Sequence, residues 1–310
     1  MKPKTWFWSV IMLAGGVVLS VFTLNYFFDP FNFRGTNDIL AEKKMVGNIM
    51  NGKLFSIVEF NHSPPVRNFI FGDSRSGGLN VDTFKNEGMG NFYNLSLGGG
   101  TLYEERDLFW WIASRQRIDS VVFSISFLAY TKRYSSNIIP EMVQLLNEPS
   151  KYYTSMFTAK SSFQLIRLLL EDRPAETNLE DKDKLWNRAL STADTMLYGY
   201  ERPNDLYREF ARIVAYCREH NIAIVLFIPP VHVDVQKRIE KHNLLREYNI
   251  FKNDMINLGP EVVDFDTVNN ITEDRNKWAD PQHLADDKSF QILTHAIVSA
   301  FKKTKGNTTH

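Results

Sequence analysis

VRNFIFGDSR, residues 66–75, opens the part of the chain that decides the fold. Its first six residues are mostly apolar, and a glycine follows them directly. A short run of this kind fits a strand that is buried on both faces, as in a parallel sheet. Four further runs of four to seven residues share this character: 92–97 (FYNLSL), 121–127 (VVFSISF), 222–228 (IAIVLFI) and 262–265 (VVDF). We therefore expect five strands.

Helical patterns lie between most of these runs. Asn204 can cap a helix whose apolar side chains recur at i, i+4, i+7, i+8 and i+11. That face consists of Leu206, Phe210, Ile213, Val214 and Cys217. A second stripe, closed by two lysines near the negative end of the helix, consists of Phe290, Leu293, Ile297 and Phe301. Strands that alternate with helices predict an α/β fold with a doubly wound, mainly parallel five-stranded sheet over residues 66–304.

One long region interrupts this alternation. Residues 131–203 contain no clear strand pattern, and we predict a largely helical insertion between the third and fourth strands. The polar residues 305–310 are predicted to form a frayed tail.

Residues 6–28 contain no charged side chain and carry aromatic residues near both ends, where aromatic belts form. About 20 helical residues cross a hydrocarbon core of about 30 Å, so this run is long enough to span a membrane. A cleaved signal peptide is the alternative, but the run is long for a signal core, and no small-x-small cleavage site precedes Asp29. We predict one transmembrane helix at residues 6–28 and a stalk at residues 29–65.

The charges beside this helix favour one orientation. Lys2 and Lys4 favour a cytoplasmic N-terminus, residues 1–5, with the following domain on the periplasmic or outer face of an inner or plasma membrane. Arg34, Lys43 and Lys44 on the other side of the run oppose this preference.

The composition excludes several classes of function. Thirty-six basic and 36 acidic side chains give a formal charge of zero, which argues against a nucleic-acid partner. The single cysteine, Cys217, excludes an internal disulfide and a cysteine-rich metal cluster. The glycine run at residues 98–100 lacks the lysine of a phosphate-binding loop, and no metal-ligand motif is present. We therefore expect neither a metal nor another cofactor.

Three loops predicted at one edge of the sheet carry chemistry. Ser74 follows the first strand, and the glycines of residues 98–100 follow the second. Thr101 and Glu104 have the spacing of a capping box, so backbone N–H groups at that helix start can face an oxyanion. Before the last helix, Asp280 can hold one imidazole nitrogen of His283 while the other nitrogen faces outward. Together these loops supply a nucleophile, a general base and the residue that orients the base.

These motifs resemble the GDSL/SGNH hydrolase family. The GDS sequence after the first strand corresponds to the family's first block, NLSLGGGT (residues 94–101) to its second, and DPQH (residues 280–283) to its last. The resemblance implies an SGNH, flavodoxin-like fold, with Ser74, His283 and Asp280 as catalytic residues and the N–H groups of Ser74 and Gly99 as oxyanion donors.

Two further stretches narrow the resemblance. The predicted membrane helix is followed by NYFFDPFNF (residues 25–33), and the fourth strand ends in IPPVH (residues 228–232). Both are similar to the membrane-anchored branch that includes the teichoic-acid D-alanylation protein and related envelope-polysaccharide acylation factors. This implies a serine esterase or O-acyltransferase that acts on an envelope glycan or an acyl carrier. If the chain is a transferase, its single predicted span cannot move an acyl group across the bilayer, so we expect a separate multi-span membrane exporter to supply that group.

One block departs from the family pattern. The family's third block carries an asparagine that donates to the oxyanion, whereas the matching position here is near Leu128. A missing donor costs roughly 3–4 kcal/mol of transition-state stabilisation. Either Tyr130 or another side chain takes its place, or the two backbone N–H groups suffice, or the enzyme is slow. A non-catalytic anchored partner or glycan-binding subunit of an acylation machinery is therefore the alternative function.

The weaker candidates for binding substrate are Arg75, Tyr130 and His232. Arg75 follows the candidate nucleophile and either pairs with an anionic substrate group or forms a structural ion pair. His232 follows two prolines at the end of the fourth strand and is either part of the same rim or a surface-loop histidine.

Overall fold

The computed structural model describes residues 3–29, 33–34, 52–156 and 181–306. It divides the chain into two compact units. The N-terminal unit comprises residues 1–63 and 140–179, and the sheet unit comprises residues 64–139 and 180–310.

The sheet unit contains a five-stranded sheet in which every neighbouring pair is parallel. The strands have the order β2-β1-β3-β4-β5. They are β1 (Asn68–Asp73), β2 (Phe92–Leu97), β3 (Ser120–Ser124), β4 (Ala223–Ile228) and β5 (Glu261–Asp264). Each of the five apolar runs therefore forms a strand, with ends shifted by up to three residues, and the predicted doubly wound topology is confirmed.

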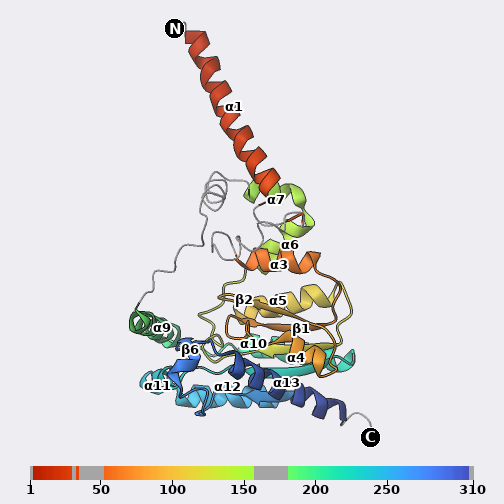
Figure 1. Cartoon of the computed structure of the whole chain (residues 1–310), viewed down its shortest axis with the longest axis vertical. Helices are drawn as coiled ribbons and strands as arrows, with labels where there is room; N and C mark the ends of the chain where they lie inside the picture. The colour runs from red at the N-terminus through yellow and green to blue at the C-terminus, as the bar shows by residue number, and fades with distance from the viewer. Residues whose placement is uncertain (1–2, 30–32, 35–51, 157–180, 307–310) are drawn as a thin grey trace. The chain divides into compact units, whose positions relative to one another are not determined.

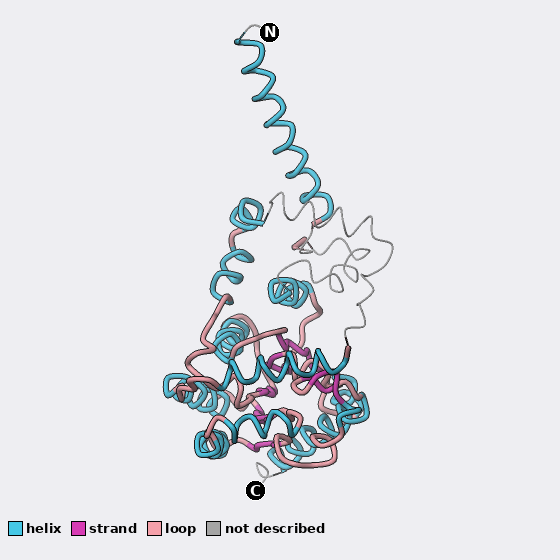
Figure 2. Tube along the Cα trace, turned by 90° about the vertical axis from the view of Figure 1, so that its left-hand side faces the viewer, coloured by secondary structure: helices cyan, strands magenta, loops and turns pink. Residues whose placement is uncertain are grey.

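Helices cover both faces of this sheet (Figure 1). On one face α4 (Val81–Asn86) contacts α13 (Asp287–Gly306), and on the other α5 (Leu102–Ala113) contacts α10 (Asn204–Glu219). Figure 2 shows the strands in magenta enclosed between these helices. The remaining helices of the unit are α9 (Lys182–Leu197), α11 (Val233–Lys241) and α12 (Leu245–Asn257), and α6 (Ile139–Asn147) begins at the unit's boundary.

The apolar faces predicted for two helices are buried. All five predicted side chains of α10 and all four of α13 lie in the core. Asn204, however, does not cap α10: the capping position is Pro203, which makes no side-chain cap hydrogen bond, and Asn204 is already the first helical residue.

Helices also fill the described part of the predicted insertion. Within residues 131–203 the structure has α6, α7 (Pro149–Met156) and α9, and residues 157–180 lie outside the described residues. The insertion does not form a single unit, because residues 140–179 group with the N-terminal unit and the rest with the sheet unit.

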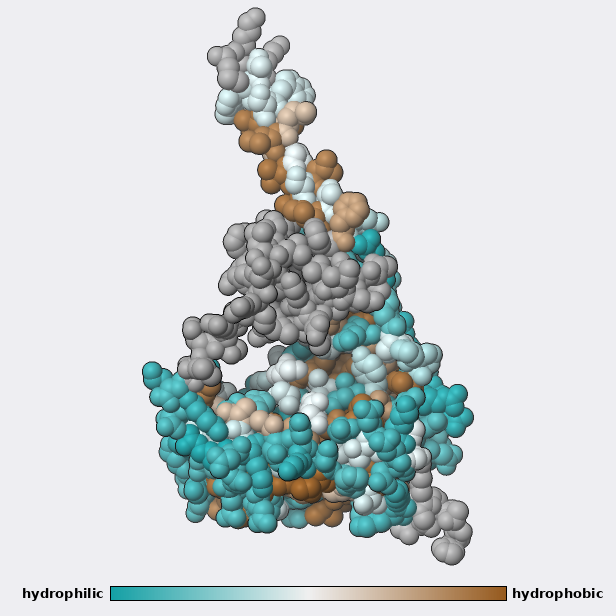
Figure 3. Space-filling view, viewed as in Figure 1, coloured by the Kyte–Doolittle hydropathy of each residue, from teal (hydrophilic) through white to brown (hydrophobic). Residues whose placement is uncertain are grey.

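The N-terminal unit contains α1 (Pro3–Phe28) and α3 (Gly52–His62). Within α1, residues Thr5–Phe27 are long and apolar enough to cross a membrane, and most of their side chains are exposed, although Asn25 near the end of the helix is buried (Figure 3). Of the predicted stalk, residues 30–32 and 35–51 lie outside the described residues.

The end of α1 contacts α7 within this unit. The Asp29 carboxylate accepts hydrogen bonds from the N–H groups of Phe33 and Arg34 and from the Tyr152 hydroxyl, at 2.9, 2.8 and 3.3 Å. The Phe33 and Tyr152 rings stack with their centroids 4.1 Å apart. In the first part of the insertion, Tyr152 of α7 thus hydrogen-bonds to Asp29, which directly follows α1, and stacks on Phe33.

Candidate active site

Ser74 lies in the turn that follows β1, at the carboxyl end of a central strand. Gly72 allows the chain to approach β3 there, since a Cβ at this position would lie 2.7 Å from the Ser124 Cβ. The Ser76 hydroxyl donates back to the Asp73 carbonyl at 3.0 Å and closes the turn. The Ser74 side chain therefore projects from a turn that its neighbours fix.

His283 approaches Ser74 from the other end of the sequence. Its Nε2 lies 2.8 Å from the Ser74 Oγ, and its Nδ1 lies 2.7 Å from the Asp280 Oδ2. The short antiparallel strands β6 (Trp278–Asp280) and β7 (His283–Leu284) hold this pair. Because Asp280 is a hydrogen-bond acceptor when ionised, the proton of neutral His283 belongs on Nδ1, and the Nε2 lone pair faces the serine hydroxyl.

Both oxygens of the Asp280 carboxylate accept hydrogen bonds. Its Oδ1 accepts the N–H groups of Gln282 and His283 at 2.8 and 3.1 Å. Burial opposes ionisation of Asp280, but the hydrogen bond and charge of His283, with these backbone bonds, outweigh it and lower the pKa of Asp280. Asp280 is therefore ionised at neutral pH and can stabilise a protonated His283.

A cavity of about 370 Å³ adjoins these side chains. One wall is the helix α9, which contacts β6 (Figure 1). The lining residues come from the serine turn, the glycine loop, the loop that follows β3 (residues 125–138, the third loop), α9 and the His283 loop: Asp73, Ser74, Arg75, Gly99, Gly100, Tyr134, Leu185, Arg188, Ala189, Thr192, Met196, Asp280, Gln282 and His283. The volume suits a small acyl group beside the serine, and the insertion thus supplies part of the site.

The glycine loop borders the same cavity. Gly99 has a φ of +62°, a conformation that favours glycine. Gly100 lies so close to the end of β2 that an added Cβ would be 2.9 Å from the Leu97 carbonyl oxygen. The predicted capping box is confirmed: the Thr101 hydroxyl accepts the Glu104 N–H, and the Glu104 carboxylate accepts the Thr101 N–H.

Arg75 is buried, although it borders the cavity. Its guanidinium forms an ion pair with Asp73, whose carboxylate also accepts the Arg75 N–H at 2.9 Å. Burial opposes the charge, but Asp73 outweighs it and raises the pKa of Arg75. Of the two roles expected for Arg75, the structural ion pair is the one that the structure shows.

Tyr130 is not at the site. Its hydroxyl donates to the Asp254 carboxylate at 3.1 Å, and its ring packs against Phe251 inside the core. Among the alternatives for the missing oxyanion donor, replacement by Tyr130 is therefore excluded, and Tyr130 does not border the cavity as a substrate-binding residue either. Its side chain is directed towards α12.

His232 is neither part of the rim nor a surface-loop histidine. It is buried, and it caps α11, with Nδ1 accepting the Asp234 N–H at 3.1 Å. Its ring packs edge-on against Trp186 and Trp278. Its backbone N–H donates to the Pro281 carbonyl at 2.9 Å, so this turn supports the loop that carries His283.

Two parts of the site were missed from the sequence. Tyr134, from the loop after β3, borders the cavity and donates its hydroxyl to the Gly99 carbonyl at 3.1 Å. One face of α9 forms the other missed part, with side chains at i, i+4, i+7 and i+11: Leu185, Ala189, Thr192 and Met196. That spacing could have identified a helix face, but nothing in the sequence places it beside Ser74.

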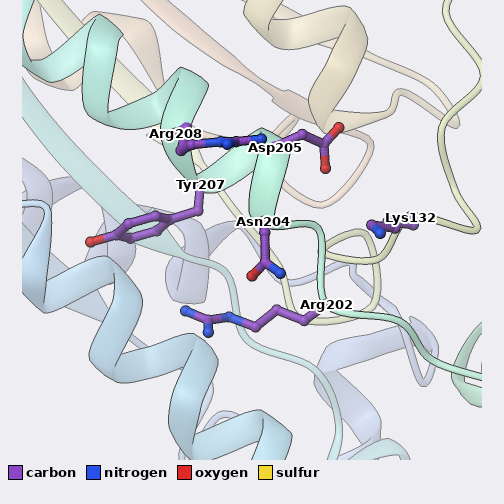
Figure 4. A pocket seen from close by; sticks show the side chains of 6 residues that line it. All are labelled: Lys132, Arg202, Asn204, Asp205, Tyr207 and Arg208. Atoms are coloured by element: carbon purple, nitrogen blue, oxygen red, sulfur yellow. The ribbon is translucent and has the colours of Figure 1, made fainter.

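A larger hollow of about 760 Å³ lies at the start of α10 (Figure 4). Its lining residues are Lys132, Arg202, Asn204, Asp205, Tyr207 and Arg208. Two of its charges already have partners: Arg202 pairs with Asp254, and Asp205 accepts the Tyr103 hydroxyl at 3.1 Å. These residues include no nucleophile beside a base, so the smaller cavity is the candidate active site. Among the described residues, no cluster of three or more His, Cys, Asp or Glu is placed to hold a metal ion.

Comparison with known proteins gives matches in structure alone. No protein-family model matches the chain, and no curated protein sequence matches it. Among solved structures, a proposed acylhydrolase from Bacteroides fragilis aligns over 81% of this chain and 95% of its own, with 12% identity and a TM-score of 0.40.

Two further solved structures are similar. A GDSL-like lipase from Bacteroides thetaiotaomicron aligns over 83% of this chain and 99% of its own, with 12% identity and a TM-score of 0.38. An acetyl xylan esterase aligns over 75% and 98%, with 14% identity and a TM-score of 0.34. At these scores the likeness does not say which reaction this chain performs.

Proposed function

We propose that this chain is a membrane-anchored serine esterase or O-acyltransferase that acts on an acyl ester of a cell-envelope glycan. The observation that carries the proposal is the row of contacts from Ser74 Oγ to His283 Nε2 at 2.8 Å and from His283 Nδ1 to Asp280 at 2.7 Å. A scaffold has no need of a hydroxyl, an imidazole and a carboxylate in this order beside a cavity.

The proposed reaction starts with the Ser74 hydroxyl. Its oxygen attacks the ester carbonyl carbon, and its proton moves to His283 Nε2. Asp280 stabilises the imidazolium, and the N–H groups of Ser74 and Gly99 hold the oxyanion. The C–O bond to the alcohol then breaks, and His283 returns the proton to the leaving oxygen.

The second half-reaction decides between esterase and transferase. Water or a sugar hydroxyl gives its proton to His283 and attacks the Ser74 ester. The acyl group then leaves on the incoming oxygen, and Ser74 recovers its proton. Both acceptors reach the acyl-enzyme in the same way, so the same residues serve hydrolysis and transfer.

The membrane helix restricts where the substrate lies. We infer that α1 anchors the chain in an inner or plasma membrane with the sheet unit on the periplasmic or outer face, as Lys2 and Lys4 favour. The substrate is then a membrane-proximal envelope glycan or an acyl carrier. For a transferase, one span among the described residues is too little to move an acyl group across the bilayer, and a separate multi-span exporter is the expected partner.

The experiment is envelope-glycan acylation in cells that make either the wild-type chain or Ser74→Ala at equal levels. Less acylation in the variant means that the chain is a transferase, and more means that it is an esterase. Equal acylation, with ester hydrolysis by the purified wild-type chain still present, would reject the envelope substrate and keep the chemistry.

A second function has one observation in its favour. Leu128 is buried, and the third loop brings no side-chain amide to the cavity. A non-catalytic anchored partner of an acylation machinery would have no use for that donor. Purified full-length chain that is folded, hydrolyses no p-nitrophenyl acetate and still binds its partner would favour this alternative.

A further inference from the structure

The third loop reaches the oxyanion side of the site through Tyr134. The Tyr134 hydroxyl donates to the Gly99 carbonyl at 3.1 Å, and both residues border the cavity that contains Ser74. The family resemblance places a side-chain donor on the same loop, near Leu128, whose side chain is buried here. Tyr134 is therefore the residue of this loop that contacts Gly99, one of the two proposed oxyanion donors. It contacts a backbone carbonyl and not the oxyanion itself.

The backbone at Gly99 is easily moved unless a hydrogen bond restricts it. Glycine without a side chain has the most conformational freedom to lose, and Gly99 is solvent-exposed with a φ of +62°. The neighbouring Gly100 N–H is held by the Leu97 carbonyl at 2.8 Å. The hydrogen bond from Tyr134 to the Gly99 carbonyl restricts the peptide group that joins Gly99 to Gly100. It thereby restricts the conformation of this exposed turn.

Two more hydrogen bonds join the same two segments. The Thr101 hydroxyl donates to the Ser136 carbonyl at 2.7 Å, and the Ile138 N–H approaches the Glu104 carboxylate at 3.4 Å. These bonds lie at the buried start of α5. The third loop is therefore held by hydrogen bonds from Ser136 and Ile138 to the buried start of α5, and by the hydrogen bond from Tyr134 to the exposed Gly99.

The surroundings keep Tyr134 a donor. Burial and the negative charges of Asp73 and Glu104 raise its pKa, and Arg75 offsets only part of this effect. The phenol therefore keeps its proton at neutral pH and donates it to the Gly99 carbonyl.

We propose that Tyr134 is a positioning residue for acyl transfer: its hydroxyl holds the glycine loop so that the Gly99 N–H faces the oxyanion, in place of the direct amide donor that the third loop lacks. The inference rests on the proposed function of Ser74. The oxyanion is then stabilised by the backbone N–H groups of Ser74 and Gly99, and Tyr134 keeps the second of them in position.

The test is Tyr134→Phe in the full-length chain in detergent, which removes one oxygen and retains the ring. The matched control is Tyr207→Phe, another half-buried tyrosine of the same unit, which lines the hollow at α10. With p-nitrophenyl acetate, and with the active sites counted by labelling Ser74 with a fluorophosphonate, we expect kcat to fall about tenfold in Tyr134→Phe, as for one hydrogen bond. KM should change less than about twofold. Tyr207→Phe should match the wild type.

Amide hydrogen exchange gives a readout that needs no substrate. In Tyr134→Phe, the peptide covering residues 98–102 should exchange several-fold faster than in the wild type, while peptides from β1 and α13 do not change. Unchanged exchange in that peptide would overturn the positioning role, whatever the enzyme does.

Other outcomes separate this inference from the proposed function. A wild-type chain that labels and hydrolyses, together with an unchanged kcat in Tyr134→Phe, would reject Tyr134 and leave the Ser74 mechanism standing. A rise in KM alone would mean that Tyr134 binds substrate, which also contradicts the inference. A folded wild-type chain without labelling would reject both, because there would be no oxyanion to stabilise.

Discussion

Two histidines of this protein each lie within three residues of an aspartate, and they are used in opposite ways. His283 has a side chain that is 41% exposed, and its Nδ1 lies 2.7 Å from Asp280. The side chain of His232 is 6% exposed, and its Nδ1 lies 3.4 Å from the Asp234 carboxylate while it accepts the Asp234 N–H. The two turns are neighbours, since the His232 N–H donates to Pro281.

The difference lies in which ring nitrogen carries the proton. In His232, Nδ1 accepts a backbone N–H, so the proton of the neutral ring is on Nε2 inside the core. In His283, Asp280 holds the Nδ1 proton, and Nε2 is left to accept from the Ser74 hydroxyl. An Asp–His pair therefore indicates a general base only when its free nitrogen faces a nucleophile in a cavity.

The largest effect is expected from removing the imidazole of the site. His283→Gln should lower the rate of p-nitrophenyl acetate hydrolysis by about 10⁴- to 10⁶-fold, because Ser74 loses its base. The free energy of unfolding should change by less than about 1 kcal/mol, since the side chain is partly exposed. Steady-state kinetics and urea unfolding of the full-length chain measure the two quantities. A variant with more than a tenth of wild-type activity would refute the assignment of the base.

Asp280→Asn is expected to have the next largest effect. The amide can hold the imidazole in the wrong tautomer, with the proton on Nε2, and the rate should fall by about 10⁴-fold. Asp234→Asn is the matched control beside His232, and its activity should stay within about threefold of the wild type. Equal losses in the two variants would mean that the two histidine turns do not differ as described.

His232→Ala should reverse the pattern. The change removes a helix cap and a buried ring that contacts Trp186 and Trp278, which should cost about 2–4 kcal/mol of unfolding free energy. His232→Asn restores a capping acceptor, an amide oxygen in place of Nδ1, and should recover about 1 kcal/mol of this loss. Activity per folded molecule should remain within about tenfold of the wild type. A stable His232→Ala variant without activity would place His232 in the reaction.

The smallest expected effect is on the pH dependence of stability. Burial lowers the pKa of His232, and the Asp234 charge offsets only part of this. The unfolded chain takes up the proton near pH 6.5, whereas the folded protein resists it. The contribution of neutral His232 to the unfolding free energy is therefore fully present above about pH 6.5 and is lost as the pH falls below that value.

His232→Asn removes this titration. The unfolding free energy of the variant should fall less steeply between about pH 7 and pH 5 than that of the wild type, as measured by urea unfolding at each pH. Parallel curves for the two proteins would show that His232 takes up its proton equally well in the folded state.

The sheet could be predicted because each strand is a short apolar run that can be recognised without knowing which strand it pairs with. The three site motifs could be placed at one edge because parallel strands end together, and Ser74, His283 and Asp280 do meet there. The prediction that these residues catalyse acyl transfer stays a prediction until it is measured.

The errors come from side chains whose role depends on packing. Tyr130 and Tyr134 lie in the same loop, and only the backbone turn after β3 decides that the first points to Asp254 and the second to Gly99. The end of its strand allows His232 either a place on the rim or a place in a surface loop, but His232 instead caps the first turn of α11 and its ring is buried. The cavity wall from α9 comes from an insertion whose path the strand pattern does not determine.

The central claim is that Ser74 is a nucleophile activated by His283. The direct measurement is labelling of the full-length chain in detergent with a fluorophosphonate, followed by mass spectrometry of the modified peptide. We expect one adduct, on Ser74, that forms in the wild type and in His232→Asn and is lost in His283→Gln. A folded wild-type chain that takes no label, or an adduct on another residue, would contradict it.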